Sequence, residues 1–175
     1  MELTDGICTD LATYLFKLQN LKFFIFNSEK VTNNFLSDIS VSLINKDKLQ
    51  GIEFYCKLIG DIGIKNFIHE LFKIKTISHL FFSGSNIKYQ GVYEIASYLE
   101  TLPMLLHFGL CSKESGNPES MLLIKPLSIH PELEYAYLGC TLYLVDKMSK
   151  EFQQNVALLL SKSNPQTKLF LEKAK

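Results

Sequence analysis

Residues 77–82 read Ile77-Ser78-His79-Leu80-Phe81-Phe82, with apolar side chains at the first, fourth and sixth positions. The same apolar-x-x-apolar-x-apolar pattern recurs at intervals of 28 residues without an insertion. Its five copies begin at Leu21, Leu49, Ile77, Leu105 and Leu133. Short alternating runs of this kind are typical of a β-strand with one buried face. The chain therefore contains five candidate strands at a fixed spacing.

Each candidate strand is followed by a segment with helical periodicity. In the first four copies, two apolar residues stand 18 and 22 positions after the copy begins, which is the i, i+4 spacing of one helix face. These pairs are Ile39 and Leu43, Phe67 and Leu71, Ile95 and Leu99, and Leu123 and Leu127. In the fifth copy, Phe152 and Val156 stand one place later, so we expect a helix shifted by one residue. Six aligned columns hold 27 apolar residues out of 30, against about 14 expected from 47% apolar composition, which indicates a true internal repeat.

A strand and a helix repeated in this way resemble the leucine-rich repeat of the ribonuclease-inhibitor type, whose units read L-x-x-L-x-L, then a turn, then a helix. The resemblance implies an α/β fold, a leucine-rich-repeat solenoid forming a short horseshoe. Its parallel sheet would line the concave side and its helices the convex side. The units depart from the family eight places after their first residue, where Asn or Cys is usual. That column holds Glu29, Lys57, Ser85, Lys113 and Thr141.

The repeat divides the chain into three parts. Residues 1–20 match the helical half of a unit, so they form an N-terminal helical cap or a half repeat of a longer array. Residues 21–160 contain the five repeats. Residues 161–175 hold a closing strand at Leu169 and Leu171, followed by a charged tail. In the fourth unit, Pro118 and Pro126 leave no room for a full helix, so an irregular convex side is expected there.

Composition excludes several classes of protein. Eighteen acidic residues balance eighteen basic residues, all of them lysine, which argues against a nucleic-acid partner. The acidic start does not fit a secretory signal, and no apolar run is long enough for membrane insertion. The four cysteines form no CxxC pair, and no Asn-x-Ser/Thr sequon occurs. An intracellular, cytoplasmic location is expected.

The alternate positions of each strand point out of the sheet onto the concave face, because successive side chains of a strand face opposite ways. Fifteen residues are assigned to this face, and the apolar surface they create favours a docking site for protein. The predicted partner-binding residues are Phe23, Ile25, Glu53, Tyr55, His79, Phe81, His107, Tyr135 and Tyr137. Tyr55, Phe81, Tyr135 and Tyr137 are the expected anchors. Fifteen residues fall below the roughly twenty to thirty of a standard interface, which favours a subunit or segment of a larger assembly.

Signals for catalysis are weak, and neither a catalytic residue, a metal site nor a cofactor is predicted. Gly60 to Gly63 lacks the Lys-Ser/Thr of a phosphate loop and is interpreted as a strand-to-helix turn. His69-Glu70 lacks the second histidine of a zinc-protease motif. His79 and His107 share a column, with Cys111 on the same face, so three candidate zinc ligands converge where a structural site needs four.

Four alternatives to docking on the sheet stay open. The chain could be an inhibitor or a sensor array of an innate-immune-like receptor, which rests on analogy of fold alone. Its convex helices could make the contact instead. A metal- or thiol-dependent enzyme would use His79, His107 and Cys111. Finally, another segment of a longer chain could cover the concave face.

Overall fold

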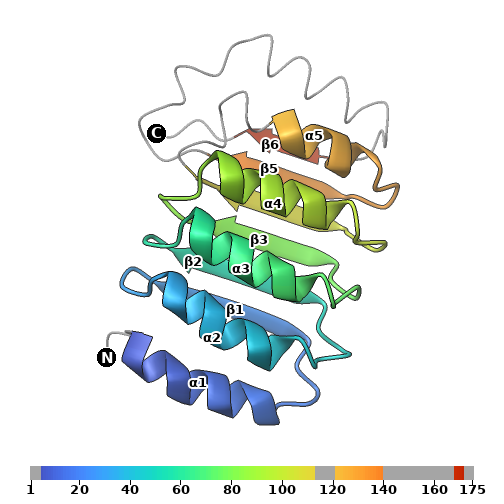
Figure 1. The fold of residues 1–175 in the computed structure, drawn as a ribbon. Helices are drawn as coiled ribbons and strands as arrows, with labels where there is room; N and C mark the ends of the chain where they lie inside the picture. Colours follow the sequence, from blue (N-terminus) through green and yellow to red (C-terminus); the bar gives the residue numbers. More distant parts are fainter. Residues whose placement is uncertain (1–4, 113–120, 140–167, 172–175) are drawn as a thin grey trace.

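The computed structural model describes residues 5–112, 121–139 and 168–171. In this part of the chain, helices and strands alternate and the strands form one parallel sheet in the order β1 to β6. The helices are α1 (Asp5–Lys17), α2 (Asn33–Leu43), α3 (Asp61–Leu71), α4 (Tyr89–Leu99) and α5 (Met121–Ser128). The strands are β1 (Phe23–Ser28), β2 (Gly51–Cys56), β3 (His79–Ser83), β4 (His107–Cys111), β5 (Tyr135–Gly139) and β6 (Lys168–Leu171). The protein is therefore an α/β solenoid whose helices stack along one face of the sheet (Figure 1).

Neighbouring strands are aligned residue for residue. Phe24 lies opposite Ile52, which lies opposite Leu80, and the row continues to Phe108. Each partner stands 28 positions further along the sequence, as 24, 52, 80 and 108 show. Because no strand is displaced along its neighbour, side chains with the same place in each strand form straight rows across the sheet. These rows decide which residues meet on either face.

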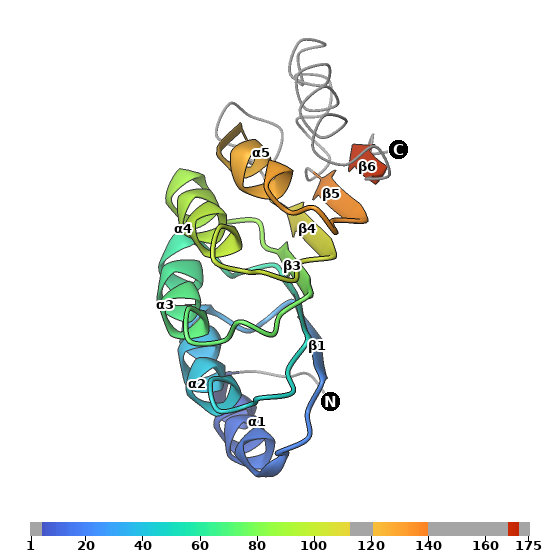
Figure 2. The same cartoon turned by 90° about the vertical axis from the view of Figure 1, so that its right-hand side faces the viewer.

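The core lies between the sheet and the helices. The inward-pointing residues of the strands are buried there, together with one stripe of each helix. The four apolar pairs expected on the helix faces, from Ile39 and Leu43 to Leu123 and Leu127, are each at most 1% exposed. The stack bends so that the helices lie on its outer side and the strands on its inner side (Figure 2). The concave face is thus made by the sheet, as the sequence predicts.

The expectation of an irregular convex side in the fourth unit is wrong. Helix α5 continues the row of helices and runs through Pro126 to Ser128. It has eight residues where α2, α3 and α4 have eleven. Proline removes only one helical hydrogen bond, and burial of Leu123 and Leu127 against the sheet offsets that loss. The proline therefore shortens this unit without interrupting the fold.

The segment Gly60 to Gly63 is also more than a turn. Gly60 is the residue that caps the start of α3, and Gly63 lies within the first turn of the helix. The side chain of Asn33, from the preceding unit, accepts a hydrogen bond from the Gly60 amide at 2.9 Å. A Cβ at Gly63 would overlap the Asn33 side-chain oxygen. Glycine at this place therefore lets a neighbouring unit reach the helix N-terminus.

The same arrangement recurs one unit later. Asp61 accepts hydrogen bonds from the amides of Lys88 at 2.6 Å and of Gly91 at 3.0 Å, at the start of α4. Helix N-termini carry unpaired amide donors and a partial positive charge, so a carboxylate at this place is stabilising. Reading the segment as a simple turn missed this role. The signal was present, because Asn33 and Asp61 stand 28 residues apart, as do Gly63 and Gly91.

The two ends of the stack have different coverings. At the N-terminal end, α1 packs against α2, and buried Lys46 donates a hydrogen bond from Nζ to the Phe16 carbonyl at 2.8 Å. At the other end, β6 pairs with β5 where the sequence predicts a closing strand. None of the helices in the described ranges has the length and apolar content needed to cross a bilayer. The predicted helix at Phe152 and Val156, Cys140 and the charged tail lie outside those ranges.

Candidate functional site

The concave face carries three rows of side chains. The rows follow from the strand register, which places each residue beside the equivalent residue of the next strand. They are Phe23, Gly51, His79, His107 and Tyr135; then Ile25, Glu53, Phe81, Gly109 and Tyr137; then Asn27, Tyr55, Ser83 and Cys111. All nine predicted contact residues therefore lie on one face. Phe23, Ile25 and Tyr55 are 44%, 61% and 37% exposed.

Two glycines shape this face. Phe81 and Gly109 are opposite each other on β3 and β4, and a Cβ at Gly109 would overlap the Phe81 ring. The ring consequently lies over the glycine and reaches Tyr137 on β5, with ring centroids 5.9 Å apart. Phe23 lies over Gly51 in the same way and contacts the His79 ring edge-on at 5.4 Å. Each glycine thus allows one aromatic ring to bridge three strands.

The rings join into two chains of contacts. The first runs along the starts of the strands from Phe23 through His79 and His107 to Tyr135, with centroid separations of 5.4, 4.3 and 6.0 Å. The second runs from Tyr55, stacked on Phe81 at 4.8 Å, to Tyr137. Aromatic pairs at these separations attract each other beyond their burial. The face is therefore a connected aromatic surface.

A hollow lies between the two chains of rings, and we call it the aromatic slot. Its volume is about 230 Å³. Backbone around Gly109 forms its floor, because that residue contributes no side chain. The side chains that line it are Glu53, Tyr55, His79, Phe81, His107 and Tyr135. Residues from four consecutive strands, β2 to β5, thus meet in one small site.

Acidic groups supply the polarity of this region. The Tyr55 hydroxyl donates a hydrogen bond to Glu53 Oε2 at 2.9 Å. Burial, and then this hydrogen bond to the carboxylate, raise the pKa of Tyr55 to about 12, so the phenol stays neutral and a donor. His107 Nε2 lies 3.2 Å from Glu134 Oε2. Glu134 was missed by sequence reasoning because it precedes its strand and so falls outside the alternating positions.

The two histidines are neighbours, and their environment differs from that of an exposed imidazole. Their ring centroids are 4.3 Å apart and the rings are nearly perpendicular, at 74°. Ser78 Oγ lies 2.8 Å from His79 Nδ1. Burial, followed by repulsion from His107, lowers the pKa of His79 below its ordinary value. His79 is therefore neutral near pH 7.

A second hollow adjoins the aromatic slot where the chain enters the strands. It measures about 450 Å³ and is lined by residues that include Asp47, Ser78, Met104 and Glu132. His79 lines both hollows, so they are continuous. The Met104 side chain is 64% exposed. The docking face thus extends beyond the fifteen strand positions to the adjoining loops.

The expected convergence of His79, His107 and Cys111 is wrong. Cys111 stands four residues after His107 on β4, and four residues of strand extend about 13 Å. Metal–ligand bonds to zinc are about 2 Å long, so one ion cannot reach both ends of that strand. Within the described ranges, no group of three His, Cys, Asp or Glu side chains is placed to hold a metal ion.

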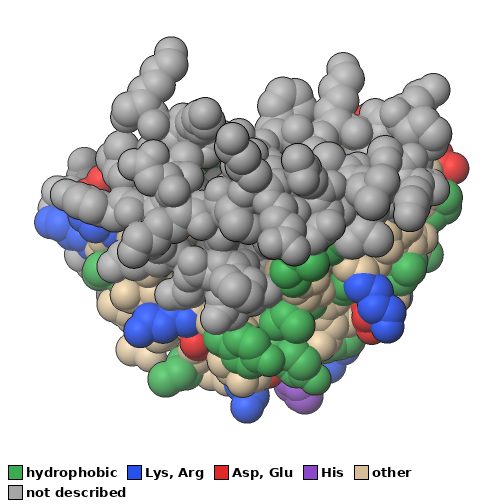
Figure 3. Space-filling model, turned by 90° about the horizontal axis from the view of Figure 1, so that it is seen from above, with side chains coloured by type: hydrophobic (Ala, Val, Ile, Leu, Met, Phe, Trp, Pro, Cys, Tyr) green, Lys and Arg blue, Asp and Glu red, His purple; other side chains and the backbone are tan. Residues whose placement is uncertain are grey.

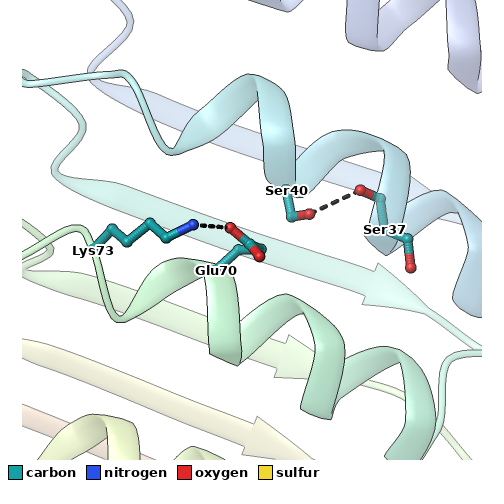
Figure 4. Close-up of polar contacts among 4 residues, drawn as sticks. All are labelled: Ser37, Ser40, Glu70 and Lys73. Carbon is teal, nitrogen blue, oxygen red and sulfur yellow. Dashed lines mark hydrogen bonds and ion pairs between the residues drawn. The ribbon is translucent and has the colours of Figure 1, made fainter.

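The convex side offers a different kind of surface. A hollow of about 360 Å³ lies over α2 and α3, near His69. Its polar groups have partners within their own segment, because Ser40 Oγ donates to the Ser37 carbonyl and Lys73 pairs with Glu70 (Figure 4). The hydrogen bond from Lys73 lowers the pKa of Glu70. Seen from the C-terminal end of the stack, the described surface mixes hydrophobic with charged side chains (Figure 3).

Comparison with known proteins identifies a fold and not a family. No protein-family model matches the chain, and no curated protein matches its sequence significantly. Among solved structures, it is similar to leiomodin-1 actin-binding site 2, with a TM-score of 0.64 and 17% identity. The similarity covers 93% of this chain and 91% of the other. The chain therefore shares the overall fold of that domain.

Proposed function

We propose that this chain is a non-catalytic protein-interaction module that docks a protein partner on its concave sheet face. The observation that carries the proposal is the exposed aromatic surface, where Phe23, Ile25 and Tyr55 are each more than a third exposed. Contiguous exposed apolar surface commonly marks an interaction site. Tyr and Phe also lose little side-chain entropy on binding, which suits them as anchors.

The rigidity of the stack also supports docking. Six hydrogen-bonded strands hold the side chains in fixed rows, so a partner meets a surface that needs little ordering. The similar solved domain is described as an actin-binding site, and actin is a protein. From that protein we carry over only the general role of protein binding. We further propose that this chain works in the cytoplasm within a larger assembly, as a leucine-rich-repeat scaffold.

The proposal is tested by comparing two triple variants in a crosslinking pull-down from native extract. The first variant, Tyr55→Ser, Phe81→Ser and Tyr137→Ser, removes anchors from the concave face. The second, Tyr14→Ser, Val41→Ser and Tyr93→Ser, removes exposed apolar side chains from the helices, where these residues are 61%, 58% and 49% exposed. Circular dichroism confirms that both are folded.

The proposed function requires a partner that is captured by the native chain and the helix variant and lost by the concave variant. Its binding must also be reproduced with the purified partner, because capture from an extract can be indirect. A partner kept by the concave variant and lost by the helix variant would place the contact on the convex side. That result would overturn the docking face while leaving the fold unchanged.

A further inference from the structure

The size of the aromatic slot selects the kind of group that fits it. Its volume of about 230 Å³ is several times the roughly 30 Å³ that a water molecule occupies in the liquid. It is smaller than the roughly 300–1,000 Å³ of pockets that enclose small-molecule ligands. A single side chain projecting from a larger partner is therefore the occupant that its size favours.

The charge at the slot selects the chemistry of that side chain. Within the described ranges, Tyr55 is the donor that reaches Glu53, and no lysine pairs with this carboxylate. None of the fifteen strand positions on the concave face is a lysine, although the chain has eighteen. A partner that covers the face removes water from Glu53, and a desolvated carboxylate without a countercharge is strongly destabilising. A cationic group at this place avoids that penalty.

The rings around the slot favour the same chemistry. Tyr55 and Phe81 are stacked on one side, and Tyr135 lies beyond His107 on the other. A cation within about 6 Å of an aromatic centroid is attracted by the ring, and desolvation strengthens that attraction. A guanidinium group can also lie flat against a ring while donating two hydrogen bonds to one carboxylate. An ammonium group lacks this planar fork.

We propose that the aromatic slot receives a basic side chain of the docked protein, arginine in preference to lysine, with its charge on Glu53 and its plane against the rings. This inference rests on the proposed function of the concave face. It also makes the partner a different protein and not a second copy, because the eighteen basic residues of this chain are all lysines.

The test uses the labelled 175-residue chain and NMR titration with N-acetylarginine methylamide. The neutral isostere N-acetylcitrulline methylamide is the control ligand. The arginine probe should shift the amide of Gly109 and the ring signals of Phe81 and Tyr55, with a dissociation constant on the order of millimolar or weaker. The citrulline probe should not produce those shifts, because it keeps the shape and lacks the charge.

Two isosteric variants assign the effect to the slot. Glu53→Gln should weaken binding of the arginine probe at least about tenfold, because a charge-assisted hydrogen bond becomes a neutral one. Glu29→Gln, an exposed change away from the slot, should leave the probe's affinity unchanged. The dispersed amide spectrum of each variant reports directly that it is folded.

The outcomes separate this inference from the proposed function. Equal shifts with arginine and citrulline, no shifts, or binding that survives Glu53→Gln would each overturn the slot inference. The pull-down can still show a partner lost by the concave triple variant, and docking then stands without a basic anchor. When a partner is in hand, Glu53→Gln should weaken its binding by a similar factor, and unchanged binding would refute the inference.

Discussion

The ring of Phe81 lies over Gly109, the residue opposite it on the next strand, in space that any other side chain would fill. Gly109→Ala places a methyl group under the ring and forces it to move. We expect this substitution to lower the free energy of unfolding by about 1–3 kcal/mol, the usual range for overpacking. Urea denaturation measures the change.

A double-mutant cycle isolates the cause. With Phe81→Ala already in place, the same Gly109→Ala change should be neutral or stabilising, since the clash is gone and alanine is less flexible than glycine. An equal loss of stability in both backgrounds would mean that the methyl group is resisted by something other than the Phe81 ring.

The pKa of His79 provides a second prediction. Burial and the neighbouring His107 lower it, whereas Glu53 and Glu134 oppose that shift. Tyr55, Tyr135 and Ser78 are the other polar groups nearby, and they are neutral. NMR titration should therefore find the pKa of His79 below the ordinary value of about 6.5. His107→Gln should raise it, because a positive neighbour is removed.

The sign of the effect on stability follows from that shift. The unfolded chain binds a proton at His79 more readily than the folded chain does, so stability falls as pH drops below about 6.5. The loss should be smaller in a His79→Gln variant, which has no proton to take up at this place. Identical acid sensitivity in both proteins would exclude His79 as a contributor.

Asp61 provides a third prediction through the start of α4. Asp61→Ala removes the acceptor for the amides of Lys88 and Gly91 and should reduce stability by about 1–2 kcal/mol, as loss of a helix cap does. Asp61→Asn keeps one oxygen acceptor and should lose less. Asp38→Ala, at an exposed place on α2, is the matched control and should change thermal stability little.

Lys46 provides a fourth prediction through α1. Its Nζ is buried, burial lowers its pKa, and it donates to the Phe16 carbonyl near the end of that helix. Lys46→Met keeps most of the side-chain volume and removes the donor. Hydrogen exchange of the α1 amides should quicken, while amides of α3 and α4 stay protected. Lys48→Met, whose exposed Nζ reaches Asn20, should leave α1 unchanged.

The positions of strands and helices could be predicted from the sequence because apolar spacing is nearly invariant along the chain. Leu80 and Phe82, for example, alternate with His79 and Phe81, and the structure buries the first pair and leaves the second pair partly exposed. The fourth helix of the repeat was misjudged because Pro126 was weighed by its local effect alone. Burial of Leu123 and Leu127 outweighs one missing hydrogen bond.

The composition of the concave face could be predicted as well, but its relief could not. Alternation assigns Phe81 and Gly109 to the face without indicating that one lies over the other. The distance between His107 and Cys111 along the strand was overlooked because both residues share a face. Glu134 and the hollow beside Met104 depend on loop geometry, which the periodic pattern does not describe.

The links between units run in one direction. Asn33 supplies an acceptor for α3, and Asp61 supplies one for α4, so each helix start depends on the unit before it. Neither acceptor depends on the unit that follows. As the chain leaves the ribosome, each new helix therefore meets an acceptor that has already been synthesised. Removing units from the C-terminal end should thus be tolerated better than removing them from the N-terminal end.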